Sequence, residues 1–261
     1  MVEIGEPIRR GVRTIVTITP PDHSCSITET VRDARATPAL ITLAPRGAVR
    51  GVTLLAHGGR SKSLSPGSRL QAPAIRMYPF MLGVHAEGRG HGIATCQLRY
   101  RVRGYNDGDP VADVRWALEE IARRHGDEPV CLVGHSMGGR SVLRAAGSDN
   151  VRAVAALAPW LPPGEPVDQL AGRSVVIAHG QRDRVTDPAG SLEFALRGRR
   201  VAERLCRFEV ARSGHAMLER FWLWQQLVRQ VAMAALGAEP WSEPLRAGFA
   251  MRDEQACRIA L

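Results

Sequence analysis

From about residue 50 onward, short apolar runs alternate with longer segments in which apolar residues recur at helical spacing. Each run is bounded by Gly, Pro or His, which is typical of strands that are buried on both faces of a parallel sheet. The predicted strands are residues 51–56, 93–98, 130–133, 151–157, 174–178 and 204–210. The alternation predicts an α/β fold, with a mostly parallel central sheet and helices on both of its faces.

The segments between these runs carry the start and stop signals of helices. The predicted helices are residues 109–122, residues 136–146, a helix that starts at 187–188, and residues 216–236. In the first of them, Val111, Val114 and Leu118 lie on one face, and Asp109 precedes Pro110 as a potential cap. These helices would pack on the sheet through one apolar face.

The two ends of the chain lack this alternation. Residues 13–19 alternate like an exposed strand and residues 19–38 are polar and interrupted by prolines, so we expect antiparallel edge strands and a long loop within 1–48. Residues 238–261 combine prolines with charge and form either a docked or a partly disordered tail. We therefore predict one domain over residues 1–261, with its core at about 50–236 and minimal or no cap domain.

The chain is basic, with a formal net charge of +9 over 261 residues. Lys62 is the only lysine, and the arginines are spread along the chain without a dense run. Codon bias and a solvated surface explain this charge more simply than a nucleic-acid partner does, and no nucleic-acid-binding motif is present. We expect no nucleic-acid partner.

Cysteine usage and hydropathy indicate a reducing compartment. The five cysteines form an odd set without a CxxC pair, as in proteins that keep their thiols free. The N-terminal residues have no apolar signal segment, and no apolar stretch approaches the roughly 20 residues of a membrane span. The expected location is the cytoplasm, without a membrane partner.

The strongest chemical signal is the run VCLVGHSMGG at residues 130–139, in which Gly134 and Gly138 flank Ser136 at a spacing of two. The run lies between a predicted buried strand and a predicted helix. There a serine occupies a strained turn that lifts its hydroxyl above the sheet edge, and the positive end of the helix faces it. A tight turn with a capping serine is the structural alternative, but the strand–helix context favours a nucleophile.

In this context the chain resembles the α/β-hydrolase superfamily over roughly residues 50–236. The resemblance implies a catalytic triad in the order serine, acid, histidine. Asp183, in the run HGQRD after the strand at 174–178, occupies the position of the acid, whereas Asp187 precedes a proline and is expected to cap a helix. Asp168 is a more remote candidate. His215, in a Gly-His pair after the last predicted strand, occupies the position of the base.

Three other histidines, His57, His135 and His179, each adjoin a motif glycine and are expected to pack loops. The resemblance also implies an oxyanion hole made by two backbone amides. One is that of Met137, after the nucleophile, and the other lies in the turn that follows the strand at 51–56. Gly59 is the preferred donor there and Arg60 the second, although a simple glycine turn would give the same sequence.

The surroundings of the predicted site are less specific. The connector at residues 159–173 holds four prolines and is too short for a cap domain, so we expect an open site. Trp160 in this connector either walls the pocket or packs on the surface. Residues 60–79 form a potential partial cover, where Arg60, Lys62 and Arg69 would favour a substrate with a carboxylate or phosphate.

The sequence thus predicts a serine hydrolase that cleaves an ester, thioester or amide of a small-molecule acyl substrate through an acyl-serine intermediate, most simply an esterase. No metal-binding or cofactor-binding motif is present, so no cofactor is expected. An acyltransferase with the same triad and a non-catalytic binding protein on the same fold are the alternatives. The sequence leaves the oligomeric state open.

Overall fold

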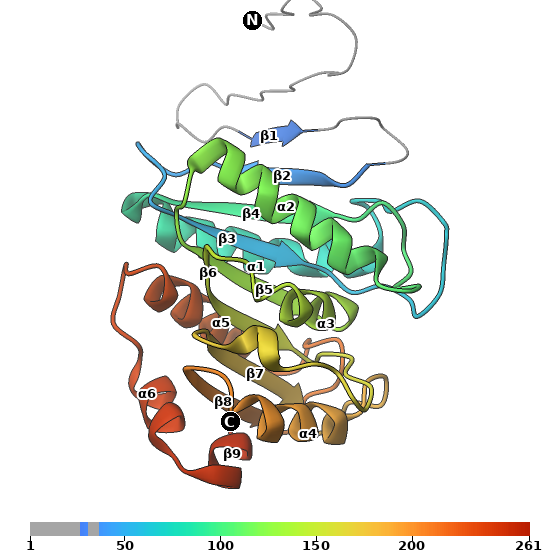
Figure 1. Ribbon diagram of the computed structural model, residues 1–261, viewed down its shortest axis with the longest axis vertical. Helices are drawn as coiled ribbons and strands as arrows, with labels where there is room; N and C mark the ends of the chain where they lie inside the picture. The colour runs from blue at the N-terminus through green and yellow to red at the C-terminus, as the bar shows by residue number, and fades with distance from the viewer. Residues whose placement is uncertain (1–26, 31–36) are drawn as a thin grey trace, which may run out of the picture.

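The computed structural model describes residues 27–30 and 37–261, which build one sheet with helices on both faces (Figure 1). The nine strands described follow the order β1-β2-β4-β3-β5-β6-β7-β8-β9. Their bounds are β1 Ile27–Thr30, β2 Ala39–Leu43, β3 Gly51–Ala56, β4 Ile93–Arg99, β5 Val130–His135, β6 Val151–Leu157, β7 Ser174–Gly180, β8 Arg204–Val210 and β9 Ile259–Ala260. β2 runs antiparallel to both β1 and β4, and every other neighbouring pair is parallel. The predicted fold class is confirmed.

Two apolar layers hold the helices against the sheet. The helices are α1 Ala72–Gly88, α2 Asp109–His125, α3 Met137–Arg144, α4 Pro188–Gly198, α5 Phe221–Ala235 and α6 Glu243–Ala250. Residues of α2, α3 and α4 join one buried cluster, and residues of α1, α5 and α6 join the other. The strand side chains alternate between the two clusters, which is why the strands read as nearly continuous apolar runs.

The six strands predicted from the sequence are all present, with β4, β5 and β7 one or two residues longer than expected. The helix α1 was not predicted: residues 60–79 were expected to form a cover, but only the part before Ala72 is a loop. Pro79 and Gly83 interrupt the sequence pattern of α1, while tertiary packing of Met77 and Phe80 stabilises it.

One expected helix start and one expected helix cap are wrong, whereas α2 starts at residue 109 as predicted. The last large helix, α5, begins at Phe221 instead of residue 216, so the segment after β8 is a longer loop. Gly108 occupies the cap position of α2, and Asp109 is its first residue. The Asp109 carboxylate accepts a hydrogen bond from the Asn106 side chain at 2.7 Å instead of capping the helix.

The N-terminal edge of the sheet follows the prediction in part. β1 and β2 are antiparallel edge strands, as expected within residues 1–48. The strand predicted at 13–19 lies outside the described residues.

The cysteines and the lengths of the helices bear on the predicted location of the protein. Four cysteines, Cys96, Cys131, Cys206 and Cys257, are buried free thiols, whereas Cys25 is outside the described part. Within residues 27–30 and 37–261, no helix has the length and apolar character needed to cross a membrane. The cytoplasmic location stays a prediction.

The C-terminal segment is docked and extends the sheet. After α6 the chain turns back and adds β9 beside β8, in parallel. Arg207 of β8 is 1% exposed, and its guanidinium donates to the carbonyl oxygens of Cys257 and Pro188 at 2.8 and 3.1 Å. It also contacts the Glu209 carboxylate at 2.8 Å. The tail therefore supplies one hydrogen-bond acceptor to a buried cation whose charge is balanced by Glu209 of the same strand.

Deletion of residues 252–261 should lower the free energy of unfolding by at least about 3 kcal/mol, because it removes an acceptor from buried Arg207 and exposes the β8 edge. Urea unfolding checks this. Glu254→Gln is the control, since it breaks only the exposed ion pair with Arg258 and should cost less than about 1 kcal/mol. Equal midpoints for the deletion and the full chain would contradict the expectation.

Candidate active site

Ser136 lies in a strained turn between β5 and α3. Its backbone has φ 57° and ψ −118°, a conformation that non-glycine residues rarely adopt. A Cβ atom on Gly134 would collide with the carbonyl oxygen of Gly138, and one on Gly138 would collide with the carbonyl oxygen of Ala56 in β3. Glycine at both positions therefore allows α3 to approach β5 and β3 closely enough to form the turn.

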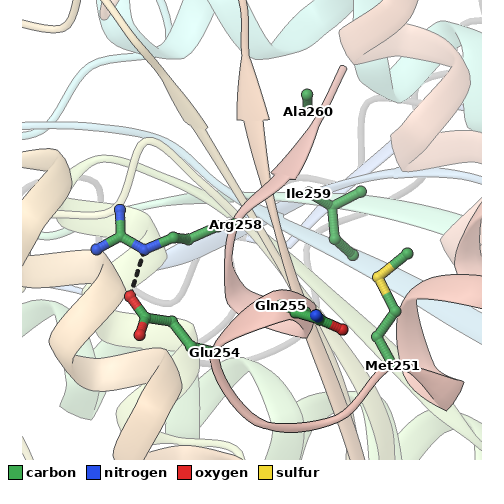
Figure 2. A pocket seen from close by; sticks show the side chains of 6 residues that line it. All are labelled: Met251, Glu254, Gln255, Arg258, Ile259 and Ala260. Carbon is green, nitrogen blue, oxygen red and sulfur yellow. Dashed lines mark hydrogen bonds and ion pairs between the residues drawn. The ribbon is translucent and has the colours of Figure 1, made fainter.

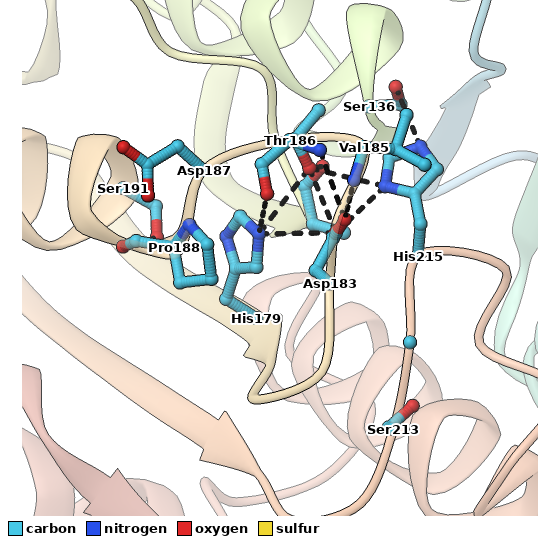
Figure 3. A network of polar contacts seen from close by, with 12 residues as sticks. Ser136, His179, Asp183, Val185, Thr186, Asp187, Pro188, Ser191, Ser213 and His215 are labelled. Carbon is cyan, nitrogen blue, oxygen red and sulfur yellow. Dashed lines mark hydrogen bonds and ion pairs between the residues drawn. The ribbon is translucent and has the colours of Figure 1, made fainter.

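The structure brings Ser136, His215 and Asp183 together at the carboxyl edge of the sheet (Figure 3). His215 Nε2 is 3.1 Å from Ser136 Oγ, and His215 Nδ1 is 2.8 Å from Asp183 Oδ2. The three residues follow β5, β7 and β8, whose parallel carboxyl ends meet at one edge. Ser136 is 9% exposed, and the His215 side chain is 14% exposed. The arrangement can pass a proton between the hydroxyl and the imidazole.

Asp183 is a buried carboxylate with several hydrogen-bond donors. The amides of Val185 and Thr186 donate to Oδ1 at 2.8 and 3.0 Å. The Thr186 hydroxyl donates to Oδ2 at 2.9 Å, and His179 Nε2 lies 3.2 Å from the same oxygen. Burial raises the pKa of the Asp183 carboxyl, but the hydrogen bonds from His179, His215 and the two amides outweigh it and hold the pKa well below its ordinary value. The carboxylate stays ionised at neutral pH.

The other acidic candidates lie elsewhere. Asp187 caps α4, and its side chain accepts from the Ala189 amide at 2.9 Å, as the sequence predicted. Asp168 is exposed in a single 3₁₀ turn, Asp168–Leu170, of the connector between β6 and β7. It is Asp183, not Asp168, that contacts the His215 ring.

The loop that carries His215 is fixed from several sides. The indole N–H of Trp224 donates to Ser213 Oγ at 3.0 Å, and the Arg182 amide donates to the Ser213 carbonyl oxygen at 3.0 Å. His135 Nε2 donates to the His215 carbonyl oxygen at 3.0 Å. These contacts join the base loop to α5, to the acid loop and to the turn of Ser136.

Of the two residues predicted for the oxyanion hole, Met137 directly follows Ser136, and Gly59 lies against the Met137 side chain; their role as donors stays a prediction. Met137 is the first residue of α3, where an amide has no partner within the helix. Gly59 is exposed in the turn after β3, and a Cβ atom on it would lie 2.5 Å from Met137 Cε. The Arg60 amide donates to the Arg103 carbonyl oxygen at 2.9 Å. This bond occupies the amide of Arg60, which was the second candidate, and leaves Gly59 as the better placed donor.

The side chain of His57 fixes this turn. Its Nδ1 donates to the Gly58 carbonyl oxygen at 2.7 Å, and its Nε2 lies 3.3 Å from Gln71 Nε2, which donates to it. The carbonyl of Gly58 and the amide of Gly59 belong to one planar peptide group and point in opposite directions. The histidine therefore orients the Gly59 amide as well as packing the loop.

Trp160 is beside the nucleophile but its ring is packed in a cluster. Its amide donates to the Ser136 carbonyl oxygen at 3.1 Å. The ring meets Tyr105 edge to face at 5.5 Å, and the Arg140 guanidinium lies 4.6 Å from the centre of the Trp160 ring. Arg140 also pairs with buried Glu165. This packing leaves Trp160 half-buried, and its contact with substrate stays a prediction.

The basic residues proposed to bind an anionic substrate are exposed. Arg60, Lys62 and Arg69 all lie in the loop between β3 and α1, and each is solvent-accessible. The loop is held to the chain after β4 by backbone bonds, such as that from the Gly67 amide to the Arg101 carbonyl oxygen at 2.9 Å. A substrate-binding role for Arg60 stays a prediction.

Sequence reasoning missed Thr186 and underestimated His179. Both contact the Asp183 carboxylate, yet neither belongs to a spacing that identifies such a contact in advance. The only signal is their position: Thr186 follows the acid by three residues in the same loop, and His179 precedes it by four residues at the end of β7. In the part of the chain that the structure describes, no group of three or more His, Cys, Asp or Glu residues is arranged to hold a metal ion.

A surface hollow lies apart from the triad, at the C-terminal segment (Figure 2). It is lined by Met251, Glu254, Gln255, Arg258, Ile259 and Ala260. The Arg258 Nε donates to the Glu254 carboxylate at 2.5 Å along one side. None of the lining residues carries a nucleophile, so this hollow offers no second reaction site of the same kind.

Comparisons with known proteins agree with this fold. Residues 47–174 match the family model described as serine aminopeptidase, S33. No curated protein matches the chain. An α/β serine hydrolase homologue from Coxiella burnetii is 13% identical, with 87% of this chain and 99% of that chain covered and a TM-score of 0.57.

Two further structures are similar. An α/β serine hydrolase without a lid from Xanthomonas campestris is 14% identical, with 90% and 100% of the two chains covered and a TM-score of 0.56. A cold-adapted esterase from an Arctic intertidal metagenomic library is 15% identical, with 85% and 99% covered and a TM-score of 0.62. At these identities the likeness to solved structures establishes the fold.

Two buried histidines should make the folded state sensitive to acid. Burial lowers the pKa of His57 from 6.5 to about 4, and burial together with the neighbouring His215 lowers that of His135 to about 3. Below pH 6.5 these histidines bind protons in the unfolded chain but not in the folded protein. The free energy of unfolding therefore falls as the pH falls from 6.5 towards 4. Each histidine contributes a slope of about 1.4 kcal/mol per pH unit.

His57→Asn keeps a donor near the Gly58 carbonyl and removes one titrating ring. Urea unfolding between pH 7 and pH 5 should therefore show a shallower loss of stability in this variant than in the wild type. Parallel pH dependences would contradict a neutral buried His57.

Proposed function

We propose that this chain is a serine hydrolase of the α/β-hydrolase type that cleaves an ester, thioester or amide bond through an acyl-serine intermediate; the family match over residues 47–174 and the fold shared with known serine hydrolases support this proposal. The observation that carries the proposal is the hydrogen-bonded series from Ser136 Oγ through His215 to the Asp183 carboxylate. A hydroxyl, an imidazole and a carboxylate in this order form the constellation that activates serine as a nucleophile.

In the first half of the reaction, Ser136 Oγ attacks the acyl carbon while His215 Nε2 takes its proton. Asp183 holds the proton on His215 Nδ1 and stabilises the imidazolium that forms. The tetrahedral intermediate then expels the leaving group, which takes the proton from His215 Nε2. The product of this half is the acyl ester of Ser136.

In the second half, His215 takes a proton from water while the water oxygen attacks the acyl carbon. The bond between the acyl carbon and Ser136 Oγ breaks, and the proton returns to the serine. The amides of Met137 and Gly59 would stabilise the negative charge of both tetrahedral intermediates. Each such donor is worth about 3–4 kcal/mol of transition-state stabilisation.

An ester is the first candidate among the three bond types. Two structural neighbours are described as esterases, one from Pyrococcus furiosus and the Arctic metagenomic esterase, and a third, from Butyrivibrio proteoclasticus, is described with ferulic acid bound. The connector between β6 and β7 holds only one 3₁₀ turn, so no cap domain from this connector restricts the access of water to Ser136, which is 9% exposed. Such access favours hydrolysis over transfer of the acyl group to another alcohol or amine.

Labelling with a fluorophosphonate tests the nucleophile. The wild type should form a covalent adduct, and Ser136→Ala should form none and lose about 10⁴- to 10⁶-fold in kcat with p-nitrophenyl esters. Ser141→Ala is the matched control, since this serine lies on α3 and donates to the Met137 carbonyl oxygen without touching the triad. It should label as the wild type does.

Labelling of Ser136→Ala at the wild-type rate would rule out Ser136 as the nucleophile. Absence of labelling and of esterase activity in the wild type would instead favour a non-catalytic protein on this fold. Product analysis with an added alcohol separates hydrolysis from acyl transfer, because a transferase would give mostly the new ester.

A further inference from the structure

A second imidazole lies behind the acid of the triad. His179 is the next-to-last residue of β7, and its side chain is 0% exposed. Its Nε2 is 3.2 Å from Asp183 Oδ2 and 3.3 Å from the Thr186 carbonyl oxygen. Figure 3 shows the ring on the side of the carboxylate away from Ser136, with the Asp183 carboxylate between the two imidazoles.

The contacts of His179 define its protonation. The Asp183 carboxylate and the Thr186 carbonyl oxygen can only accept, and the Thr186 hydroxyl, 3.4 Å from Nε2, donates its own proton to Asp183. Nε2 must therefore carry a proton and donate it. Its Nδ1 is buried without a hydrogen-bond partner among the described residues. A second proton on that nitrogen would be an unsatisfied and charged donor in the core, which is costly. The ring is therefore neutral, with its single proton aimed at Asp183.

Three donors converge on the same carboxylate oxygen. His215 Nδ1, the Thr186 hydroxyl and His179 Nε2 lie 2.8, 2.9 and 3.2 Å from Asp183 Oδ2. A carboxylate has about four lone-pair positions, so three donors on one oxygen fix its direction closely. The three donors also share the negative charge of the carboxylate, so the hydrogen bond from His179 reduces the charge that acts on His215.

We propose that His179 is a positioning residue for the triad: as a neutral donor behind Asp183, it holds the carboxylate in the orientation that His215 requires and limits the charge presented to His215. This inference rests on the proposed function. It assigns to His179 a role beyond the loop packing expected from the sequence, in which it only adjoins Gly180.

Other charged or titratable groups near His215 stay unchanged in the test. Asp183 faces its Nδ1 from the acid loop, and the His135 ring of β5 lies 4.8 Å from the His215 ring, centre to centre. Arg76 of α1 acts electrostatically on His135, and Glu219 accepts from the amide of Gly214 within the base loop. A change confined to His179 therefore reports on the donor behind the carboxylate.

Two substitutions separate the hydrogen bond from the volume of the side chain. His179→Gln keeps an N–H near the position of Nε2, whereas His179→Leu fills the space without a donor. With p-nitrophenyl esters, His179→Leu should lose about ten- to hundredfold in kcat at nearly constant KM, because the carboxylate is held less well in the transition state.

The pH profile gives a readout that a purely structural role would not move. Without the donor, Asp183 Oδ2 offers more negative charge to His215 and favours its protonated form. The acidic limb of kcat/KM in His179→Leu should therefore move to higher pH by about 0.5–1 unit. His179→Gln should restore most of kcat and return the limb to its wild-type position.

Three outcomes would overturn the inference while leaving the proposed function intact. In the first, His179→Leu keeps the wild-type kcat and pH profile. In the second, His179→Leu and His179→Gln lose the same factor in kcat together with a parallel loss of thermal stability. In the third, kcat is unchanged and only KM rises. Wild-type labelling by the fluorophosphonate is measured in the same series. If the wild type is not labelled, the proposed function itself is refuted. If it is labelled and one of the three outcomes above is found, only the inference about His179 is refuted.

Discussion

The close approach of α3 to β5 and β3 is the constraint on which the site depends. A side chain at Gly134 or Gly138 would overlap backbone atoms of the neighbouring segment. With glycine at both positions, the chain turns through Ser136 with a positive φ, and its hydroxyl meets the imidazole of His215. The strain of this turn is sustained because buried residues of β5 and α3 pack in the core on either side.

The buried charge of Asp183 imposes a second set of conditions. A carboxylate that is 0% exposed loses its hydration and must be compensated by donors. The acid loop supplies two amides and a hydroxyl from Val185 and Thr186, and two histidines complete the set. The same hydrogen bonds that keep the acid ionised also fix its orientation, so stability of the loop and geometry of the triad have one origin.

Much of the site could be predicted from the sequence because its signals are local. The spacing of glycines around Ser136 is a steric requirement of one turn, and the resemblance to the α/β-hydrolase superfamily implies Asp183 and His215 from their positions after recognisable strands. Thr186 and His179 could not be assigned in this way, because their contacts depend on how one loop folds back on the end of β7. Helix α1 was missed for a related reason: Pro79 and Gly83 obscure its periodicity, and packing against α5 outweighs its weak local signal.

The three residues of the proposed triad differ in what holds them. Ser136 is set between a central strand and a helix, whereas Asp183 and His215 lie in loops and depend on specific hydrogen bonds. A substitution that removes one of these bonds leaves the two apolar layers intact, so it should cost catalytic rate more than global stability. A substitution at Gly138 should cost both stability and rate, because it forces α3 away from β3 and disturbs the core and the turn of Ser136 together. The division follows from the fold: the nucleophile depends on packing, and the acid and base depend on polar contacts made above the sheet.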